Sequence, residues 1–374
     1  MKKVWIVEDS IVSPLGITTK ENYENLQQGI SGLQSIRDTS LSADSFYGGL
    51  VRNFSGDASR TKFDSLCSEV IDDVLIKAPI QEDRTIFILS STKGNITYLE
   101  DGKIENPRIH LHETAATLAH AYGFKNHFVI SNACISGVMA ILVGKRMIEA
   151  GLYDHAVVVG ADILSRFVIS GFQSLQALSP EACRPFDAQR KGINLGECAA
   201  AIVLTGKTEM LPAGPHIRIA GGGLSNDANH ISGPSRTGEE LGFAIQQALT
   251  EAGMNEEHID FISAHGTATL YNDEMEAKAF NLMKLGKVPL NSLKGYFGHT
   301  LGAAGVLETV LSAECLLHDE LIPSLGFEQI GVTQNLNVIK SVEHRSLKTC
   351  LKTASGFGGC NAAIILHKEY IFES

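Results

Sequence analysis

The chain lacks the basic surplus that proteins use to bind nucleic acids. It has 31 lysine and arginine residues against 42 aspartate and glutamate residues, so its formal net charge is −11. Nucleic-acid binders need lysine and arginine to neutralise phosphates and release counterions. We therefore expect a protein without a nucleic-acid partner, in which any basic docking surface is small and local.

The sequence also lacks CxxC motifs and long hydrophobic runs. Its seven cysteines are scattered, which is typical of reduced thiols in a cytoplasmic protein. No uninterrupted apolar run approaches the roughly 18 residues that span a bilayer, and the apolar stretch at residues 1–7 is too short for a signal peptide. We expect a cytoplasmic protein with no membrane span.

Short apolar runs bounded by turn residues recur along the 374 residues, with helix-like segments between some of them. Those in the first half lie at 4–7, 85–89, 127–131, 155–160 and 199–205, and those in the second half lie at 217–220, 259–263, 288–291, 349–353 and 362–367. The run at 200–204 closes the first half as the run at 362–366 closes the second, which suggests duplication. We predict an α/β fold of two five-stranded halves, residues 1–210 and 211–374, joined by a connector at 206–214.

Cys134 lies between a predicted strand at 128–133 and an apolar helix predicted to run to about residue 150. The partial positive charge at a helix N-terminus favours a thiolate and lowers the pKa of a thiol there. Amide groups at the same end can hold a developing oxyanion. The segment predicts either a nucleophile or a buried structural cysteine.

Two histidines lie at the ends of predicted elements: His265 follows a predicted strand, and His299 precedes a predicted helix. His265 follows the strand at 259–263, and Asp273 with Glu276 fits a capping box that would open a helix behind it. His299 opens a helix predicted from about residue 300 to 318. A neutral imidazole at a helix start can donate a hydrogen bond to an enolate or oxyanion. Each histidine, taken singly, is better explained as an ordinary loop residue.

The helix behind His299 carries further signals. Gly302 and Gly305 would allow a neighbouring helix to approach closely, and Glu308 interrupts an apolar stretch. A buried carboxylate requires a cationic partner, for which Lys294 is the obvious candidate. Near the C-terminus, the string GFGG at 356–359 predicts a turn with positive φ angles that exposes the Phe357 amide, or a plain tight turn.

Taken together, these segments resemble the β-ketoacyl-acyl-carrier-protein synthases, in particular the elongating, Cys-His-His type of the thiolase-like condensing enzymes. The resemblance covers nearly the whole chain. It is carried by ACISG at Cys134, RPFD at 184–187, GINLGE at 192–197, HGTATLYND at His265, KGYFGHTLGAAGVLE at 294–308 and GFGG at 356–359. It implies a thiolase-like fold with α-β-α-β-α layers, and an acyltransferase of fatty-acid or specialised polyketide or polyene elongation.

The resemblance also implies roles for single residues. Cys134 would take the acyl chain as a thioester, and His265 with His299 would bind malonyl-carrier protein and stabilise the enolate left by decarboxylation. The amides of Cys134 and Phe357 would form the oxyanion hole. The remaining roles are Lys294 and Glu308 as a supporting ion pair, Thr267, Thr269 and Gly358 in substrate binding, and the Phe357 ring as a gate. Cys360, just past the turn, is interpreted as packing.

Partners and cofactors follow from the same resemblance. It implies substrates carried on the phosphopantetheine of acyl carrier protein, no cofactor bound by the enzyme itself, no metal ligands and a homodimer. Arg60 and Lys62 are candidate docking residues for the acidic carrier, since they start an amphipathic segment, although a solvated helix start explains the two charges better. The alternative function is a non-catalytic, chain-length-determining subunit of a ketosynthase heterodimer. Such subunits usually lack the cysteine that this chain keeps.

Overall fold

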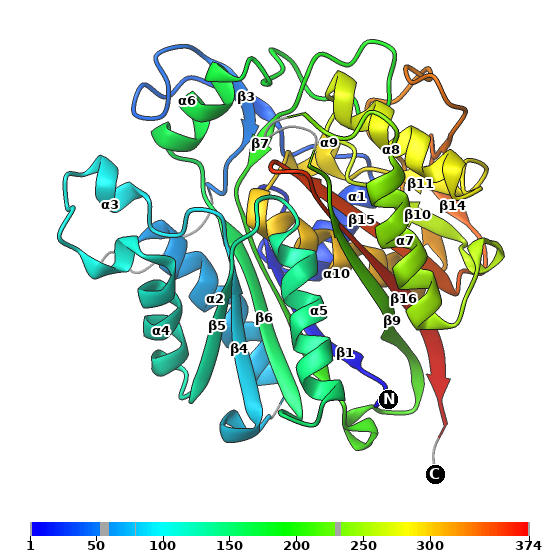
Figure 1. The fold of residues 1–374 in the computed structure, drawn as a ribbon. Helices are drawn as coiled ribbons and strands as arrows, with labels where there is room; N and C mark the ends of the chain where they lie inside the picture. Colours follow the sequence, from blue (N-terminus) through cyan, green and yellow to red (C-terminus); the bar gives the residue numbers. More distant parts are fainter. Residues whose placement is uncertain (1, 53–59, 79, 229–232, 373–374) are drawn as a thin grey trace.

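The computed structural model describes residues 2–52, 60–78, 80–228 and 233–372 (Figure 1). All ten predicted strands are present, which confirms the strand prediction. The first half contributes β1 (Trp5–Val12), β4 (Thr85–Ser90), β5 (Asn126–Ile130), β6 (His155–Asp162) and β8 (Cys198–Thr205). The second half contributes β9 (Gly214–Asn226), β10 (Phe261–Ser263), β11 (Pro289–Asn291), β15 (Thr349–Gly356) and β16 (Cys360–Ile371).

The two sets of five strands have the same order. The first runs β5-β4-β6-β8-β1 and the second β11-β10-β15-β16-β9, so in both the third strand along the chain lies at the outside and the first lies innermost. The short strand β13 (Asn337–Val338) extends the second set, and pairing of Trp5 with Arg218 joins the two sets. A boundary at residue 210 stays a prediction, which this repeated order supports.

Helices cover both sets of strands and also lie between them (Figure 1). Successive residues of β4 face different layers: Ile86 and Ile88 pack in the same apolar core as α5 and α10, whereas Phe87 and Leu89 pack with α2 and α4. A third core joins α7 and α8 to the second set of strands. The layered α-β-α-β-α prediction is therefore confirmed. The helices are α2 (Lys62–Lys77), α4 (Leu111–Ala121), α5 (Ser136–Glu149), α7 (Glu239–Ala252), α8 (Leu270–Leu282) and α10 (Ala304–His318).

The two central helices, α5 and α10, touch through glycines. A Cβ added at Gly137 would lie 2.7 Å from the backbone nitrogen of Val306, and one added at Gly305 would collide with the backbone nitrogen of Val138. Only glycine fits such backbone contact. The predicted close approach at Gly305 is confirmed, and it brings the segments before these two helices together.

Helix α10 and the turn before it form the most apolar helical stretch of the described residues. The stretch at residues 301–318 is long and apolar enough by composition to cross a membrane, with a mean hydropathy of 1.3. However, 83% of it is buried inside the protein. It is the central core helix of this fold.

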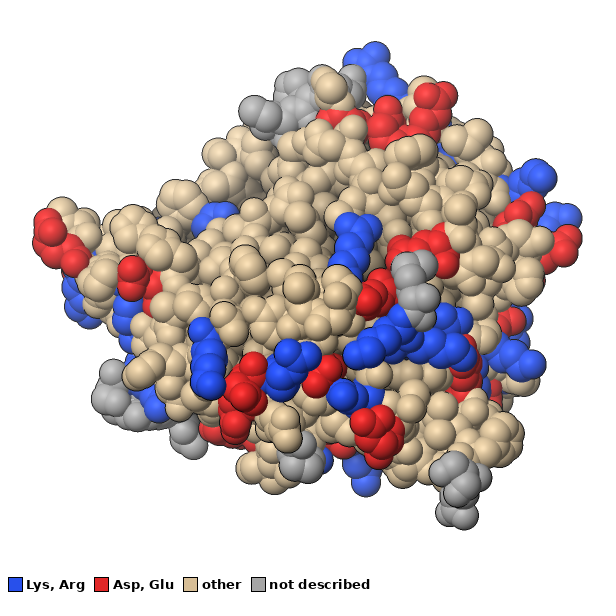
Figure 2. Space-filling model, turned by 60° about the horizontal axis from the view of Figure 1, so that its bottom comes forward, with Lys and Arg blue, Asp and Glu red and all other residues tan. Residues whose placement is uncertain are grey.

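The remaining helices and strands connect or flank these elements. They are α1 (Thr19–Gln27), β2 (Gln34–Ile36), β3 (Phe46–Gly49), α3 (Thr97–Glu100), α6 (Arg166–Ser174), β7 (Leu195–Gly196), α9 (Lys294–Phe297), β12 (Glu320–Leu321) and β14 (Glu343–His344), with 3₁₀ turns at Glu82–Arg84, Pro107–Ile109, Thr208–Met210, Glu256–His258 and Leu301–Ala303. Surface charge is uneven despite the acidic total. Figure 2 shows lysine and arginine side chains gathered with carboxylates on the face at the bottom of Figure 1.

Candidate active site

Cys134 lies in a sharp turn between β5 and α5. The residue before it, Ala133, has a left-handed backbone with φ of 44°, which costs a non-glycine residue of the order of 1–3 kcal/mol. The Ser136 hydroxyl holds the turn, since it donates to the Ala133 carbonyl at 2.6 Å and accepts from the Asn132 amide at 2.7 Å. The turn places Cys134, which is 7% exposed, with its thiol at the start of the central helix α5.

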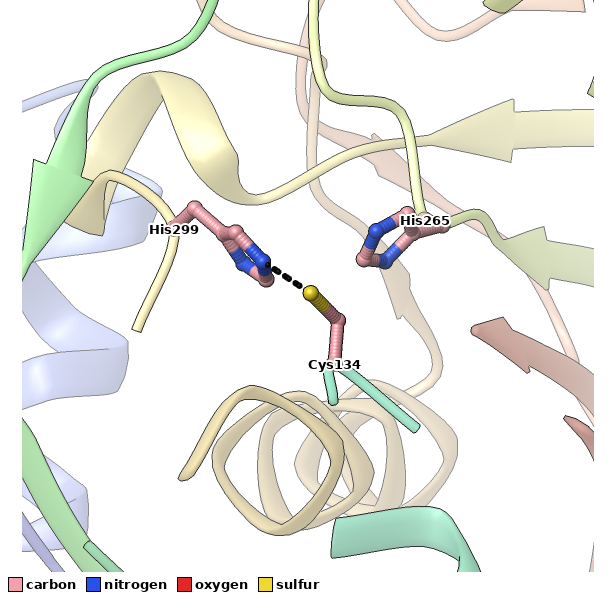
Figure 3. A group of neighbouring side chains, drawn as sticks. All are labelled: Cys134, His265 and His299. Carbon is pink, nitrogen blue, oxygen red and sulfur yellow. Dashed lines mark hydrogen bonds between the residues drawn. The ribbon is translucent and has the colours of Figure 1, made fainter. Parts of the chain in front are cut away.

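His299 lies in the loop between α9 and α10, with its Nε2 at 2.9 Å from the Cys134 sulfur (Figure 3). Its amide donates to the Asn194 carbonyl at 2.7 Å. The predicted helix start at residue 300 is wrong: Leu301 is left-handed with φ of 53°, and a 3₁₀ turn precedes α10. Sequence periodicity cannot show such a turn, because a segment of three residues is too short to distinguish a period of 3.0 from one of 3.6.

His265 lies in the loop after β10, on the other side of the sulfur (Figure 3). Its ring meets the His299 ring edge-on, with centroids 5.2 Å apart and planes at 86°. The predicted capping box is wrong, because α8 begins at Leu270 and both carboxylates lie inside the helix. Instead, Glu276 accepts from the His265 amide at 2.8 Å and Asp273 from the Thr267 amide at 3.0 Å. The two carboxylates therefore fix the loop that carries the histidine.

The three side chains share one cavity of about 440 Å³. Their ligand atoms lie within 4.8 Å of one another, close enough for one small substrate to contact all three. The same spacing would also suit a single metal ion, although the sequence predicts no metal ligands. Thr267 and Thr269 line the cavity too, with their hydroxyl oxygens 2.8 Å apart.

The glycine turn at 356–359 forms another wall of the cavity. The Phe357 backbone N–H donates to the Cys134 sulfur, and a Cβ at Gly356 would lie 3.0 Å from the Cys134 nitrogen. The Phe357 ring is 40% exposed and packs against Phe172 with centroids 5.8 Å apart. Gly358 has φ of 87°, as the turn requires, but it does not line the cavity. The amide of residue 357 is thus directed at the reactive position.

Burial dominates the electrostatics of the thiol. It raises the pKa of Cys134 to about 12; the nearby Cys360 raises it further, while Lys294 and the Phe357 N–H act in the opposite direction. The expectation of a lowered pKa is wrong, because desolvation of the thiolate outweighs the helix terminus. In the resting protein Cys134 is a thiol, which can donate its proton to His299 Nε2.

The raised pKa predicts how Cys134 reacts with iodoacetamide in the free protein. Only the thiolate is nucleophilic, and far below the pKa its fraction rises about tenfold per pH unit. We therefore expect the alkylation rate, followed by intact-protein mass spectrometry, to climb without a plateau between about pH 7 and pH 10. A plateau near neutral pH would instead indicate a stable thiolate-imidazolium pair with His299.

Both imidazoles are neutral. Burial lowers the pKa of His265 and of His299 well below the ordinary value, and Lys294 and Lys352 lower both further. The predicted neutral state is thus reached mainly through desolvation. Among the described residues, neither Nδ1 has a hydrogen-bond partner. The protein therefore leaves the tautomer of each ring free to change during a reaction.

Lys294 and Glu308 form the expected ion pair. The Lys294 ammonium lies 2.7 Å from Glu308 Oε1 and donates to the His265 carbonyl at 2.7 Å. Both residues are buried, and neither lines the cavity. Burial raises the pKa of Glu308, but Lys294 and Lys352 outweigh it and leave that pKa below its ordinary value. Lys294 therefore contacts the histidine backbone and not the reacting atoms.

Several residues at the site were missed from the sequence. Lys352 contacts Glu308, and Phe172 lines the cavity, as do Arg190, Asp227 and Asn361. Lys352 could have been noticed in the sequence, since it is the one charged residue of the strand Thr349–Gly356. Of the two candidate docking residues, Lys62 pairs with the buried Glu197, and the Arg60 side chain donates to Ser68.

Known proteins share these features. Two family profiles match the chain: "Beta-ketoacyl synthase, N-terminal domain" over residues 109–209 and "Beta-ketoacyl synthase, C-terminal domain" over residues 216–328. The chain is 34% identical to 3-oxoacyl-[acyl-carrier-protein] synthase 2 of Rhizobium meliloti over 274 residues, which are 70% of this chain and 65% of that protein. It is 29% identical to the enzyme of the same name from Vibrio cholerae, over 98% of this chain and 99% of that protein.

Solved structures of related proteins superpose on nearly the whole of this chain. A β-ketoacyl synthase from Burkholderia phymatum superposes with a TM-score of 0.87 at 25% identity, covering 99% of this chain and all of that one. A ketosynthase in complex with its chain length factor, from Xenorhabdus doucetiae, superposes with a TM-score of 0.85 at 27% identity, covering 98% of each chain. With both halves matched by profiles and the fold matched throughout, this chain belongs to the β-ketoacyl synthase family.

Proposed function

We propose that this chain catalyses the decarboxylative Claisen condensation of malonyl-acyl-carrier protein with an acyl chain held on Cys134. The observation that carries the proposal is the meeting of the Cys134 sulfur, two neutral imidazoles and the Phe357 amide in one cavity. A sulfur nucleophile, enolate donors and an oxyanion donor are what this reaction requires.

In the first step, the Cys134 sulfur attacks the thioester carbonyl of an acyl carrier protein. His299 Nε2, at 2.9 Å, accepts the thiol proton as the sulfur–carbon bond forms. The tetrahedral oxyanion accepts hydrogen bonds from the amides of Cys134 and Phe357. The carrier thiolate then leaves and takes the proton from His299, so that both histidines are neutral again.

In the second step, the malonyl thioester carbonyl binds between His265 and His299, each donating from a ring N–H. Loss of carbon dioxide leaves an enolate, whose oxygen keeps these two hydrogen bonds. The enolate carbon attacks the carbonyl carbon of the Cys134 thioester, a carbon–carbon bond forms, and the carbon–sulfur bond breaks. The thiolate then takes up a proton from solvent, which is the one proton that the overall condensation consumes. Thr267, Thr269 and the turn with Gly358 would hold the phosphopantetheine arm, while the Phe357 ring gates the acyl chain.

The proposed partner is an acyl carrier protein, in agreement with the names of the relatives.

We also propose a dimer through β5, which is the outermost strand of its set and has an exposed Phe128. An edge strand offers unpaired backbone groups to a second strand. The partner strand would come from a second copy or from a similar subunit. Light scattering of the purified protein gives the mass of the assembly, and mass spectrometry of its denatured chains shows whether one or two kinds of chain are present. All seven cysteines are free and buried, which supports a cytoplasmic protein.

The test is reconstitution of the reaction with purified protein, an acyl carrier protein series and malonyl-carrier protein. We expect carbon dioxide release together with a β-ketoacyl-carrier product two carbons longer than the donor, identified by mass spectrometry. Activity should be unchanged by a metal chelator, which separates this chemistry from a metal bound by the same three residues. Turnover by the isolated protein would exclude the non-catalytic subunit. Turnover only with a second, similar chain, in which that chain is acylated and Cys134 is not, would instead fit the non-catalytic subunit.

A further inference from the structure

Lys352 is a fully buried lysine on β15, and the proposed reaction assigns it no role. It pairs in register with Ser263 of β10, the strand that ends two residues before His265. Its ammonium donates to the Ser263 carbonyl at 3.3 Å and to the Thr353 carbonyl at 2.5 Å, and it lies 2.6 Å from Glu308 Oε2. The Lys352 side chain therefore holds the end of β10, from which the His265 loop begins, and also contacts Glu308.

Two ammonium groups converge on Glu308. Its two oxygens face Lys294 at 2.7 Å and Lys352 at 2.6 Å. A second carboxylate, Glu276, lies within electrostatic reach of both lysines and accepts from the amides of His265 and Gly266 at 2.8 and 2.6 Å. Removing one lysine from this buried cluster would leave a carboxylate without its counter-charge, which is costly. Lys352 therefore maintains the charge of the cluster that holds the His265 loop, where the anionic enolate would form.

The surroundings of both rings show which charges act on them. The titratable and charged groups that face or support the two histidines are Cys134, Asp162, Arg190, Lys191, Asp227, Asp273, Glu276, Lys294, Glu308, Lys352 and Cys360. Asp162 and Asp273 accept backbone N–H groups, as Glu276 does, and Glu308 lies between Lys294 and Lys352. Arg190 and Lys191 also line the cavity, but Arg190 lies 3.7 Å from Asp273 and Lys191 lies 3.3 Å from Glu181. Lys294 and Lys352 are the cations that lower the pKa of both rings.

We propose that Lys352 is a positioning residue for decarboxylation, which acts with Lys294 through Glu308 and the His265 loop to keep both imidazoles neutral and favour the enolate. This role rests on the proposed function. It is consistent with the influence of Lys352 on the histidines, since it lowers the pKa of each ring after burial and Lys294 have done so. Burial lowers the pKa of Lys352 itself, while the Glu308 carboxylate acts to keep it protonated.

The test compares Lys352→Met, Lys352→Gln and Lys352→Arg in two separate assays: decarboxylation of malonyl-carrier protein against pH, and acylation of Cys134 by acyl-carrier protein. Without the cation the ring pKa values rise, so neutral rings are lost at a higher pH. We expect decarboxylation by the Met and Gln variants to fall about tenfold at neutral pH. The acidic limb of the profile, where the decarboxylation rate falls as the rings become protonated, should move to a higher pH by about half a unit or more. Acylation should change less than about threefold. The Arg variant should keep the wild-type limb.

Lys145→Met is the matched control, because Lys145 is equally buried and pairs with Glu149 and Glu251 away from the cavity. It should leave the limb unchanged. An unmoved limb in both the Met and the Gln variants, or an equal fall in acylation and decarboxylation, overturns the role of Lys352. Titration of the histidine rings by nuclear magnetic resonance gives a readout without turnover: ring pKa values that stay unchanged in Lys352→Gln also overturn it. Absence of turnover in the wild type counts against the proposed function instead.

Discussion

Replacing Cys134 with alanine is expected to abolish acyl-enzyme formation and to reduce condensation by at least about 10³-fold, because the proposed thioester forms on the Cys134 sulfur. The backbone of the turn should persist, since Ala133 and Ser136 fix it without the sulfur. The Phe357 amide and both histidines also stay in place. Decarboxylation of malonyl-carrier protein should therefore continue without a carbon–carbon bond being formed.

The measurement is covalent attachment of an isotope-labelled acyl group, followed by peptide mapping. Cys360→Ala is the matched control, because Cys360 is buried beside the same turn, with its sulfur 3.4 Å from the Phe357 carbonyl. It should retain acylation at Cys134. Labelled acyl groups that still attach to the Cys134→Ala protein, or a label mapped to Cys360, would overturn the assignment of the nucleophile.

Much of the fold could be predicted from the sequence because the strands are short apolar runs between turn residues. In β4 every residue is buried, and its four central side chains, at residues 86–89, fill two different cores, so these four residues are all hydrophobic. The glycine contact of Gly305 was predictable for a similar reason, since a helix with small residues invites a close neighbour. Such features are local, and local chemistry is what a sequence shows directly.

The electrostatics of the site depended on contacts that a sequence does not show. The sign of the Cys134 pKa shift depends on how completely folding removes water, which outweighs the helix terminus. The contact of Lys352 with Glu308 joins residues from β15 and α10, which are far apart in the sequence. Likewise, Asp273 and Glu276 fit a capping box by spacing, but in the fold their carboxylates bind the His265 loop.

Replacing either histidine with alanine is expected to reduce malonyl-carrier decarboxylation by about 10²–10³-fold, the usual effect of losing one donor to a developing oxyanion. The two variants should differ in the acylation half-reaction. His299 Nε2 lies 2.9 Å from the sulfur and accepts its proton, so His299→Ala should also slow acylation by about 10²-fold or more. Among the described residues, the sulfur is hydrogen-bonded to the His299 ring and not to the His265 ring, so His265→Ala should acylate at close to the wild-type rate.

The comparison separates the two imidazoles because they meet edge-on around one sulfur but are held by different segments, the loop after β10 and the loop after α9. Carbon dioxide release and acyl-enzyme mass report the two half-reactions independently. His318→Ala serves as control, since His318 is exposed and pairs with Glu314 at the far end of α10. If His265→Ala lost acylation as completely as His299→Ala, proton transfer would involve both rings. The thiol would then react within a coupled pair of imidazoles, and the division of labour between them would be wrong.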